Sequence, residues 1–234
     1  MTPALELRRI RTRSNRSLSL SVAPGQRVGL VMAGTAGSDE LSDAIAGRAW
    51  LDEGAVLIGG ADVSVASETE RARAGLVVLG STPQVFSQLS VFENVMVATT
   101  LWPRLRRRLA EAHARRALAR AGLAEQSQTL AGSLNLTDLR RLEIACVVAV
   151  PRRAVVVAQL SFGLDATTRR DLAELLASVT IEGAGLLWLD RVETPPLPVD
   201  RLLVIDRGAI VADGVPAGVL AGPEVRNLRV AGHW

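Results

Sequence analysis

The alternation of short apolar runs with segments of helical periodicity most constrains how this 234-residue chain can fold. Three of these runs are AVVVAQL (154–160), GLLWL (185–189) and RLLVID (201–206), each far too short to span a bilayer. Runs of this kind are typical of strands buried on both faces in a parallel sheet that helices cover. With 48% hydrophobic residues and a mean hydropathy of +0.24, the chain has material for a large core. The sequence therefore predicts an α/β fold with a mainly parallel, layered core.

The remaining elements are placed by periodicity and turn residues, and the whole of 1–234 is expected to form one domain. Strands at 5–10 and 17–22 should add an antiparallel flank, and a helical subdomain should occupy roughly 86–150. The other expected elements are a strand at 26–34, a helix at 38–50, a strand and turn at 54–63, a strand at 74–80, a helix at 136–150, a strand at 153–160, a helix at 165–179, a strand at 185–190, and a hairpin at 200–220 that turns at Arg207-Gly208 and ends in a short helix.

A glycine loop, MAGTAGSDE (32–40), joins the strand at 26–34 to the following helix. Gly34 and Gly37 stand where a phosphate-binding loop would have glycines, because backbone N–H groups and a helix N-terminus bind phosphate there. Such a loop also needs a lysine and a hydroxyl side chain, but the next residues are Ser38 and Asp39. The chain contains no lysine, and all 27 of its basic residues are arginine. We expect this loop to hold no nucleotide and the side chain of Ser38 or Asp39 to cap the helix.

Five segments in order resemble the ATP-binding subunit of ABC transporters, especially the branched-chain amino-acid importer type, and the resemblance covers nearly the whole chain. They are PGQRVGL (24–30), LSVFENVMVA (89–98), RRLEIA (140–145), GLDATTRRDL (163–172) and IDRGAIVADGVPAGVL (205–220). The resemblance implies a P-loop sheet with an antiparallel flank and a helical subdomain. It also implies positions for the residues that bind and hydrolyse ATP.

At those positions the chain departs from the family. Ser38 takes the place of the phosphate-binding lysine, and Asp39 that of the Mg²⁺-binding hydroxyl. Ala158 and Gln159 replace the metal-binding aspartate and the catalytic glutamate, so neither a metal-bound water nor a general base is provided. The remaining departures are Ser81 at the glutamine-loop position with Gln84 nearby, Asn135, Leu136 and Thr137 in the signature, Arg191 at the switch histidine, and no aromatic residue for adenine at 11–16.

Other elements of the family are retained, and they concern packing and docking rather than chemistry. Gly163, Leu164 and Asp165 match the D-loop, which lies against a second ATP-binding subunit in the family. The stretch at 81–95 corresponds to the surface that contacts the transporter, and Phe86 is expected to be an exposed anchor there. The sequence thus keeps the shape of the subunit while its ATP-site residues are changed.

We interpret the chain as a degenerate, non-hydrolysing subunit that serves as a structural or regulatory partner. Its expected partners are a transmembrane permease and an intact ATP-binding subunit in a heterodimer, or a second copy of itself, at the inner face of the cell membrane. No cofactor and no specific nucleic acid are expected. Two alternatives stay open: an ATPase that uses ATP and Mg²⁺ at one composite site, and a soluble adaptor whose arginines at 104–120 meet an acidic protein or nucleic acid.

The single cysteine, Cys146, lies in the apolar stretch EIACVVAV (143–150). One cysteine can form neither an intramolecular disulfide nor a cysteine-based metal cluster. Its surroundings favour a core thiol over a nucleophile.

Overall fold

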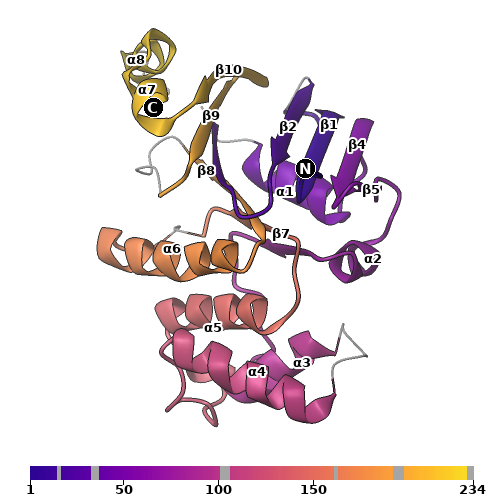
Figure 1. Ribbon diagram of the computed structural model, residues 1–234. Coiled ribbons are helices and arrows are strands. Elements are labelled where there is room, and N and C mark those ends of the chain that lie inside the picture. The colour runs from indigo at the N-terminus through magenta and orange to yellow at the C-terminus, as the bar shows by residue number, and fades with distance from the viewer. Residues whose placement is uncertain (15–16, 33–36, 101–105, 161–162, 192–197, 231–234) are drawn as a thin grey trace.

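A computed structural model of the chain describes residues 1–234 except 15–16, 33–36, 101–105, 161–162, 192–197 and 231–234, and it contains two sheets (Figure 1). The first sheet is antiparallel with the order β2-β1-β4-β5, and its strands are β1 Leu5–Arg11, β2 Leu18–Val22, β4 Glu53–Ile58 and β5 Ala61–Asp62. The second has the order β10-β9-β3-β8-β7-β6, and its strands are β3 Arg27–Met32, β6 Leu76–Leu79, β7 Ala154–Ala158, β8 Gly185–Arg191, β9 Arg201–Asp206 and β10 Ala209–Gly214. All its pairs are parallel except β9 with β10. This mainly parallel sheet with an antiparallel flank is the predicted architecture.

The helices cover both faces of the second sheet. Alternate residues of β7 face opposite ways: Val155 and Val157 join a core with α5 and α6, whereas Val156 joins a core with α1 and the antiparallel sheet. A third, smaller cluster lies beneath α7 and α8. The helices are α1 Ser38–Ala46, α2 Glu68–Arg73, α3 Val91–Thr99, α4 Arg107–Arg120, α5 Leu136–Ala149, α6 Ala166–Ile181, α7 Pro216–Ala221 and α8 Pro223–Val230.

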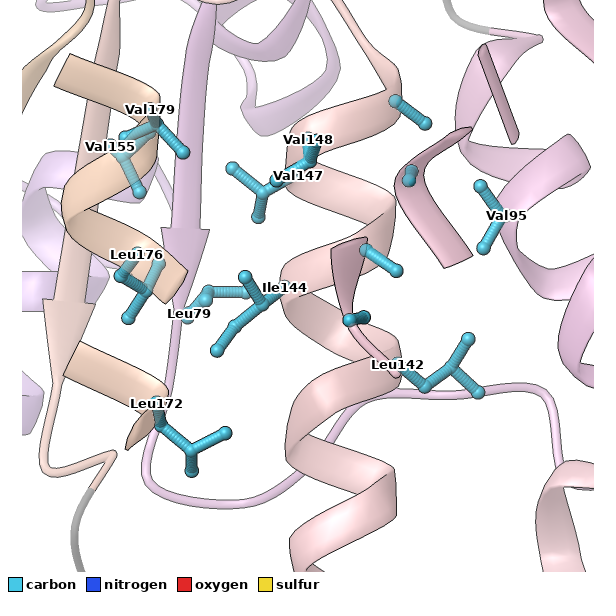
Figure 2. Close-up of a cluster of buried hydrophobic side chains, with 14 of the residues drawn as sticks. Leu79, Val95, Leu142, Ile144, Val147, Val148, Val155, Leu172, Leu176 and Val179 are labelled. Atoms are coloured by element: carbon cyan, nitrogen blue, oxygen red, sulfur yellow. The ribbon is translucent and has the colours of Figure 1, made fainter. Parts of the chain in front are cut away.

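Helices α3, α4 and α5 pack together at the end of the molecule away from the antiparallel sheet (Figure 1). Helix α5 is the centre of this helical part, because it contacts α3, α4 and α6. Figure 2 shows Ile144 and Val147 of α5 on the side of α6 and the sheet, while Leu142 lies on the opposite side. An apolar surface around most of its circumference is what a helix needs in such an enclosed place. None of the helices described is long and apolar enough to cross a membrane.

Some helices begin or end at other residues than the sequence predicts. Helix α1 ends at Ala46 rather than at residue 50, because Gly47 takes a left-handed conformation with φ 83° and closes the helix. Helix α2 is not among the elements expected from the sequence. It nevertheless begins with a capping box, in which the side chains of Ser67 and Glu70 each accept a hydrogen bond from the other's backbone N–H. The hairpin does turn at Arg207-Gly208, where both residues have positive φ.

A buried arginine fastens α2 to the end of α1. The side chain of Arg71 is 2% exposed, and its Nη1 donates hydrogen bonds of 2.8 Å to the carbonyl oxygens of Ala44 and Ile45. Its other nitrogens donate to the carbonyls of Ala66 at 3.0 Å and Ser64 at 2.7 Å. Burial lowers the pKa of Arg71, but the charge is well placed at the negative end of the α1 dipole. One side chain thus satisfies four carbonyl groups from two segments.

We expect Arg71→Met to lower the free energy of unfolding by about 3 kcal/mol, because the four carbonyl groups lose a charged donor and stay buried. Urea denaturation followed by circular dichroism would measure the change. The matched control is Arg73→Met, which removes an exposed arginine from the same helix and should cost less than about 0.5 kcal/mol. Equal effects of the two substitutions would contradict this role of Arg71.

Candidate functional site

Three neighbouring parallel strands, β3, β8 and β7, end at the same edge of the second sheet. Met32 at the end of β3 lies opposite Arg191, and Ala158 at the end of β7 lies opposite Leu189. In open parallel sheets, ligands bind just beyond the carboxyl ends of the strands. The fold therefore brings the segment at 37–40, Gln159 and the position of Arg191 to one candidate nucleotide site. Gly34 and the side chain of Arg191 lie outside the described residues.

A direct hydrogen bond between two side chains lies at the centre of this site. Gln159 Nε2 donates a hydrogen bond of 2.5 Å to Ser38 Oγ, which joins residues 121 positions apart. Ser38 is only 5% exposed, and the Gln159 backbone N–H donates to the Leu189 carbonyl at 3.0 Å. Gln159 has a φ of 49°, in the left-handed region that non-glycine residues seldom adopt. The two residues at the lysine and glutamate positions are thus partners of each other.

This contact corrects the expectation that Ser38 or Asp39 caps α1. The N-cap residue is Gly37, with a φ of 137° that favours glycine, and no side chain of the described residues makes a capping hydrogen bond to the N–H groups there. Ser38 is the first helical residue, and its hydroxyl faces Gln159 instead. Asp39 is exposed, and its carbonyl oxygen accepts a hydrogen bond of 2.9 Å from Ser42 Oγ.

The next acidic residue, Glu40, holds the turn between β1 and β2. Its carboxylate accepts hydrogen bonds from the backbone N–H of Arg13 at 2.8 Å and of Ser14 at 3.2 Å. Charge-assisted bonds of this type are stronger than those between neutral groups. The side chain therefore bonds to the turn, while Asp39 and Glu40 both place negative charge in the first turn of α1.

The position of the metal-binding aspartate offers no ligand. Ala158 is fully buried at the end of β7, and its methyl group packs in the core that includes α1. Among the described residues, no group of three or more histidine, cysteine, aspartate or glutamate side chains could hold a metal ion. The side chains that the structure describes here therefore do not fit a bound Mg²⁺, which prefers carboxylate oxygens together with substrate phosphates.

The signature and D-loop positions form a second group at the start of α5 and α6. Asn135 caps α5 by accepting from the Asp138 N–H at 2.9 Å, and Asp165 caps α6 by accepting from the Thr167 N–H at 2.9 Å. Leu136 lies against Gly163: a Cβ added to that glycine would be 3.5 Å from Leu136 Cδ2. The neighbouring Thr137 and Leu164 are half-buried. No hydrogen bond in the described part of the chain joins this group to Ser38.

A buried ion pair, which sequence reasoning missed, fixes the glutamine-loop segment to α5. Arg140 is 0% exposed, and its Nη1 lies 2.8 Å from Glu143 Oε2. Arg140 also donates to the carbonyls of Gly80, at 2.9 Å, and Ser81, while Glu143 Oε1 accepts from the Gln84 N–H at 2.8 Å. Burial raises the pKa of Glu143, and these hydrogen bonds act in the opposite direction. In the sequence, the i,i+3 spacing of Arg140 and Glu143 in RRLE could have predicted this ion pair.

A cavity of about 290 Å³ opens beside this segment, between the edge strand β6, α2, α3 and α5. Its walls include Arg71, Leu79, Gln84 and Cys146. Phe86 follows two residues after Gln84; it is 59% exposed, as expected, and its backbone N–H donates to Asn94 Oδ1 at 2.8 Å. The edge of the sheet and the helical part therefore enclose a mainly apolar hollow with an exposed aromatic residue close by in sequence.

These features are those of an ATP-binding-cassette fold. The chain belongs to the ABC transporter family, whose family model matches residues 15–157. It is 29% identical to a probable ABC transporter ATP-binding protein of Azorhizobium caulinodans, over 91% of this chain and 76% of that protein. It is 26% identical to the lipopolysaccharide export system ATP-binding protein LptB of Haemophilus influenzae, over 90% of this chain and 88% of that protein.

Solved structures show the same fold. The ADP conformation of MJ1267, an ATP-binding cassette of an ABC transporter, superposes with a TM-score of 0.83 at 20% identity, over 98% of this chain and 99% of that chain. A nucleotide-free ATP-binding cassette gives 0.81 at 20% identity, over 97% of this chain and 98% of that chain. The predicted fold class and the predicted family are thereby confirmed. The branched-chain importer type stays a prediction.

Cys146 is half-buried against the helical core and also lines the cavity. Burial, together with the nearby Glu143 carboxylate, raises the pKa of the Cys146 thiol from 9.0 to about 12. Because the thiolate is the nucleophilic form, such a thiol is inert at neutral pH. Cys146 is thus a wall of the cavity and offers no nucleophile.

We expect iodoacetamide to alkylate Cys146 about a thousandfold more slowly in the native protein than in urea at pH 8, since the raised pKa leaves that much less thiolate. The native rate should rise with pH through 9 and 10, where the rate for an ordinary thiol levels off. Mass spectrometry of timed samples would measure both rates. Rapid native alkylation at pH 8 would show instead that water reaches and stabilises the thiolate.

Proposed function

We propose that this chain is a non-hydrolysing ATP-binding-cassette subunit that acts as a structural or regulatory partner of a permease. The observation that carries the proposal is the hydrogen bond between Gln159 and Ser38, which occupies the two positions where the family has its catalytic glutamate and phosphate-binding lysine. The bond engages Ser38 Oγ with one Nε2 hydrogen of Gln159, and neither side chain supplies a positive charge for γ-phosphate or a carboxylate base for water. Neither ATP nor Mg²⁺ is expected to be a cofactor.

Charge at the start of α1 supports the same proposal. A lysine there would attract the triphosphate, whereas Asp39 and Glu40 repel it. Two unit charges about 4 Å apart interact by about 4 kcal/mol at an effective dielectric of about 20. Replacing one attraction by one repulsion therefore weakens triphosphate binding roughly a thousandfold or more.

At the adenine end of the nucleotide site, the chain also lacks the aromatic side chain that the family has there. Residues 11–16 contain no aromatic side chain on which adenine could stack. Glu40 binds the backbone of this turn through the N–H groups of Arg13 and Ser14. Besides this aromatic residue, the chain lacks the family's residues for three requirements of ATP hydrolysis: the positively charged phosphate contact at Ser38, the metal ligand at Ala158 and the base at Gln159.

We expect the purified protein to hydrolyse no Mg²⁺-ATP above the level of its Gln159→Ala variant, measured as phosphate release. A ligand that binds the folded protein at about 100 times its Kd adds about 2.7 kcal/mol of stability and raises the thermal denaturation midpoint. Because we expect no binding, millimolar Mg²⁺-ATP should leave the midpoint unchanged. A combined Ser38→Lys, Asp39→Ser, Ala158→Asp and Gln159→Glu variant provides the contrast, and Mg²⁺-ATP should raise its midpoint.

Turnover that disappears in Gln159→Ala would contradict the proposal and favour the alternative of an ATPase working at one composite site. A nucleotide-induced rise in the midpoint of the unaltered protein would show that the charge argument at α1 is outweighed. The variant with all four substitutions tests whether a lack of nucleotide response comes from the residues at the site or from misfolding. A rise of its midpoint with Mg²⁺-ATP requires that the loop and the sheet edge are folded.

The second half of the proposal concerns partners. We infer that a helix of a transmembrane permease, in an importer of the branched-chain amino-acid type, docks on the segment from Gln84, which lines the cavity, to the exposed Phe86, and holds the chain at the inner face of the membrane. The cavity, the exposed ring and the Arg140–Glu143 pair that fixes residues 80–84 support this surface. The exposed D-loop residues Gly163 and Asp165 support pairing with an intact ATP-binding subunit or a second copy.

Substituting Phe86→Ala should abolish co-purification of the permease from native membranes while changing the free energy of unfolding by less than about 1 kcal/mol, because a 59% exposed ring contributes little to the core. The matched control is Ile181→Ala, which removes an 86% exposed side chain at the end of α6. A large loss of stability would identify Phe86 as a core residue, and equal recovery of the permease with both variants would contradict the docking role.

A further inference from the structure

Helix α4 has one buried side and one strongly basic side. Its inner side consists of the buried residues Ala110, Ala114, Ala117 and Leu118, and the last three belong to the helical core. On the outer side, Arg108, Arg115 and Arg116 are all exposed, and we call these three the α4 arginine face. Two exposed alanines lie on the same side, Ala112 between Arg108 and Arg115 and Ala119 one turn after Arg115, and both are too short to shield the guanidinium groups. This surface plays no part in the nucleotide site or the docking cavity.

The arginine face lacks neutralising carboxylates, unlike other arginines of the same helix. Arg107 pairs with Glu111 at 2.9 Å and Arg120 with Glu182 at 2.6 Å. Arg108 and Arg116 form no ion pair within the described residues, and Arg115 lies over the ring of Phe92 at 5.1 Å. Among the described residues, no carboxylate therefore neutralises the three exposed arginines, and their positive charge is what an anionic partner requires.

The neighbouring residue adds an apolar element. Leu109 is 50% exposed next to Arg108, near the start of α4. A helix with arginines on its outer face and an exposed leucine beside them combines phosphate binding with shallow apolar insertion, the two contributions that hold a helix at a bilayer surface. Guanidinium groups bind phosphate oxygens through two parallel hydrogen bonds. The chemistry therefore favours a surface that presents both phosphate groups and hydrocarbon.

A nucleic acid offers phosphate as well, but it also needs groups that stack on or read bases. The chain has no tyrosine, and among the described residues the exposed aromatic side chains are Trp50 and Phe86, neither of them on α4. The position of α4 fits a bilayer better. Arg115 contacts Phe92 in the first turn of α3, and α3 directly follows the segment that contains Phe86. A permease helix bound near Phe86 would bring this end of the molecule towards the membrane.

We propose that the α4 arginine face binds the phosphate groups of anionic lipids on the bilayer next to the permease. This inference rests on the proposed place of the chain at a permease. The lipid contact adds affinity and fixes the orientation of the helical part, so that the permease contact at Phe86 and the lipid contact act together. Each basic residue near an anionic surface contributes separately, and salt screens the attraction.

The test uses the full chain and sedimentation with large unilamellar vesicles that contain no protein. Vesicles of phosphatidylcholine are compared with vesicles in which phosphatidylglycerol replaces part of it. We expect binding to the anionic vesicles alone, loss of binding at about 0.5 M salt, and about 100-fold weaker binding when Arg108, Arg115 and Arg116 are all changed to Gln. The matched control changes the three exposed arginines of β1, Arg8, Arg9 and Arg11, to Gln. It removes the same charge from the opposite end of the molecule and should retain binding.

Equal binding of the two triple variants, or equal binding to neutral and anionic vesicles, would overturn the proposal. So would binding of single-stranded RNA that depends on Arg108, Arg115 and Arg116 without binding to vesicles, since it would identify a nucleic acid as the partner. Because the vesicles contain no permease, failure here is distinguishable from failure of the proposed function. If the protein co-purifies with a permease but does not bind anionic vesicles, only the lipid proposal is contradicted and the proposed function stands.

Discussion

The parallel pairing of β3, β8 and β7 is the constraint on which the rest of the structure depends. Each of these strands is buried on both faces, so alternate side chains belong to two different cores. Val155 faces α5 and α6, while Val156 faces α1 and the antiparallel sheet. A one-residue shift in register would exchange side chains between the two cores and disrupt the packing of both. The ends of the strands are therefore fixed, and with them the loops that approach each other at the carboxyl edge.

Elements with a strong local pattern could be predicted from sequence. The buried strands were found within a few residues because continuous apolar runs between helices leave few alternatives, and the turn at Arg207-Gly208 follows from its residues. Positions at the site could be assigned because five segments in order resemble one family. Helix α2 was missed although Ser67 and Glu70 form a capping box, since six residues give little periodicity.

Contacts between segments far apart in sequence could not be predicted. Arg71 reaches the end of α1, Arg140 reaches Gly80 and Ser81, and Glu40 reaches the turn after β1. In the sequence each looks like an ordinary surface charge, because charged residues are seldom fully buried. The two arginines are buried because a guanidinium has five donors in a plane and can satisfy several carbonyl groups at once. A chain without lysine thus uses arginine for internal fastening as well as for its surface.

The contact between Ser38 and Gln159 shows how a changed site can keep its fold. Buried polar groups need partners, and in a working cassette the nucleotide, the metal and water supply some of them. Here the hydroxyl of Ser38 is 5% exposed and accepts from Gln159, whose left-handed backbone aims the side chain at α1. Replacing Gln159 by alanine would remove this bond and leave the Ser38 hydroxyl buried without this partner, at a cost of about 1–3 kcal/mol. The bond therefore joins the start of α1 to the residue that follows β7 within the chain itself.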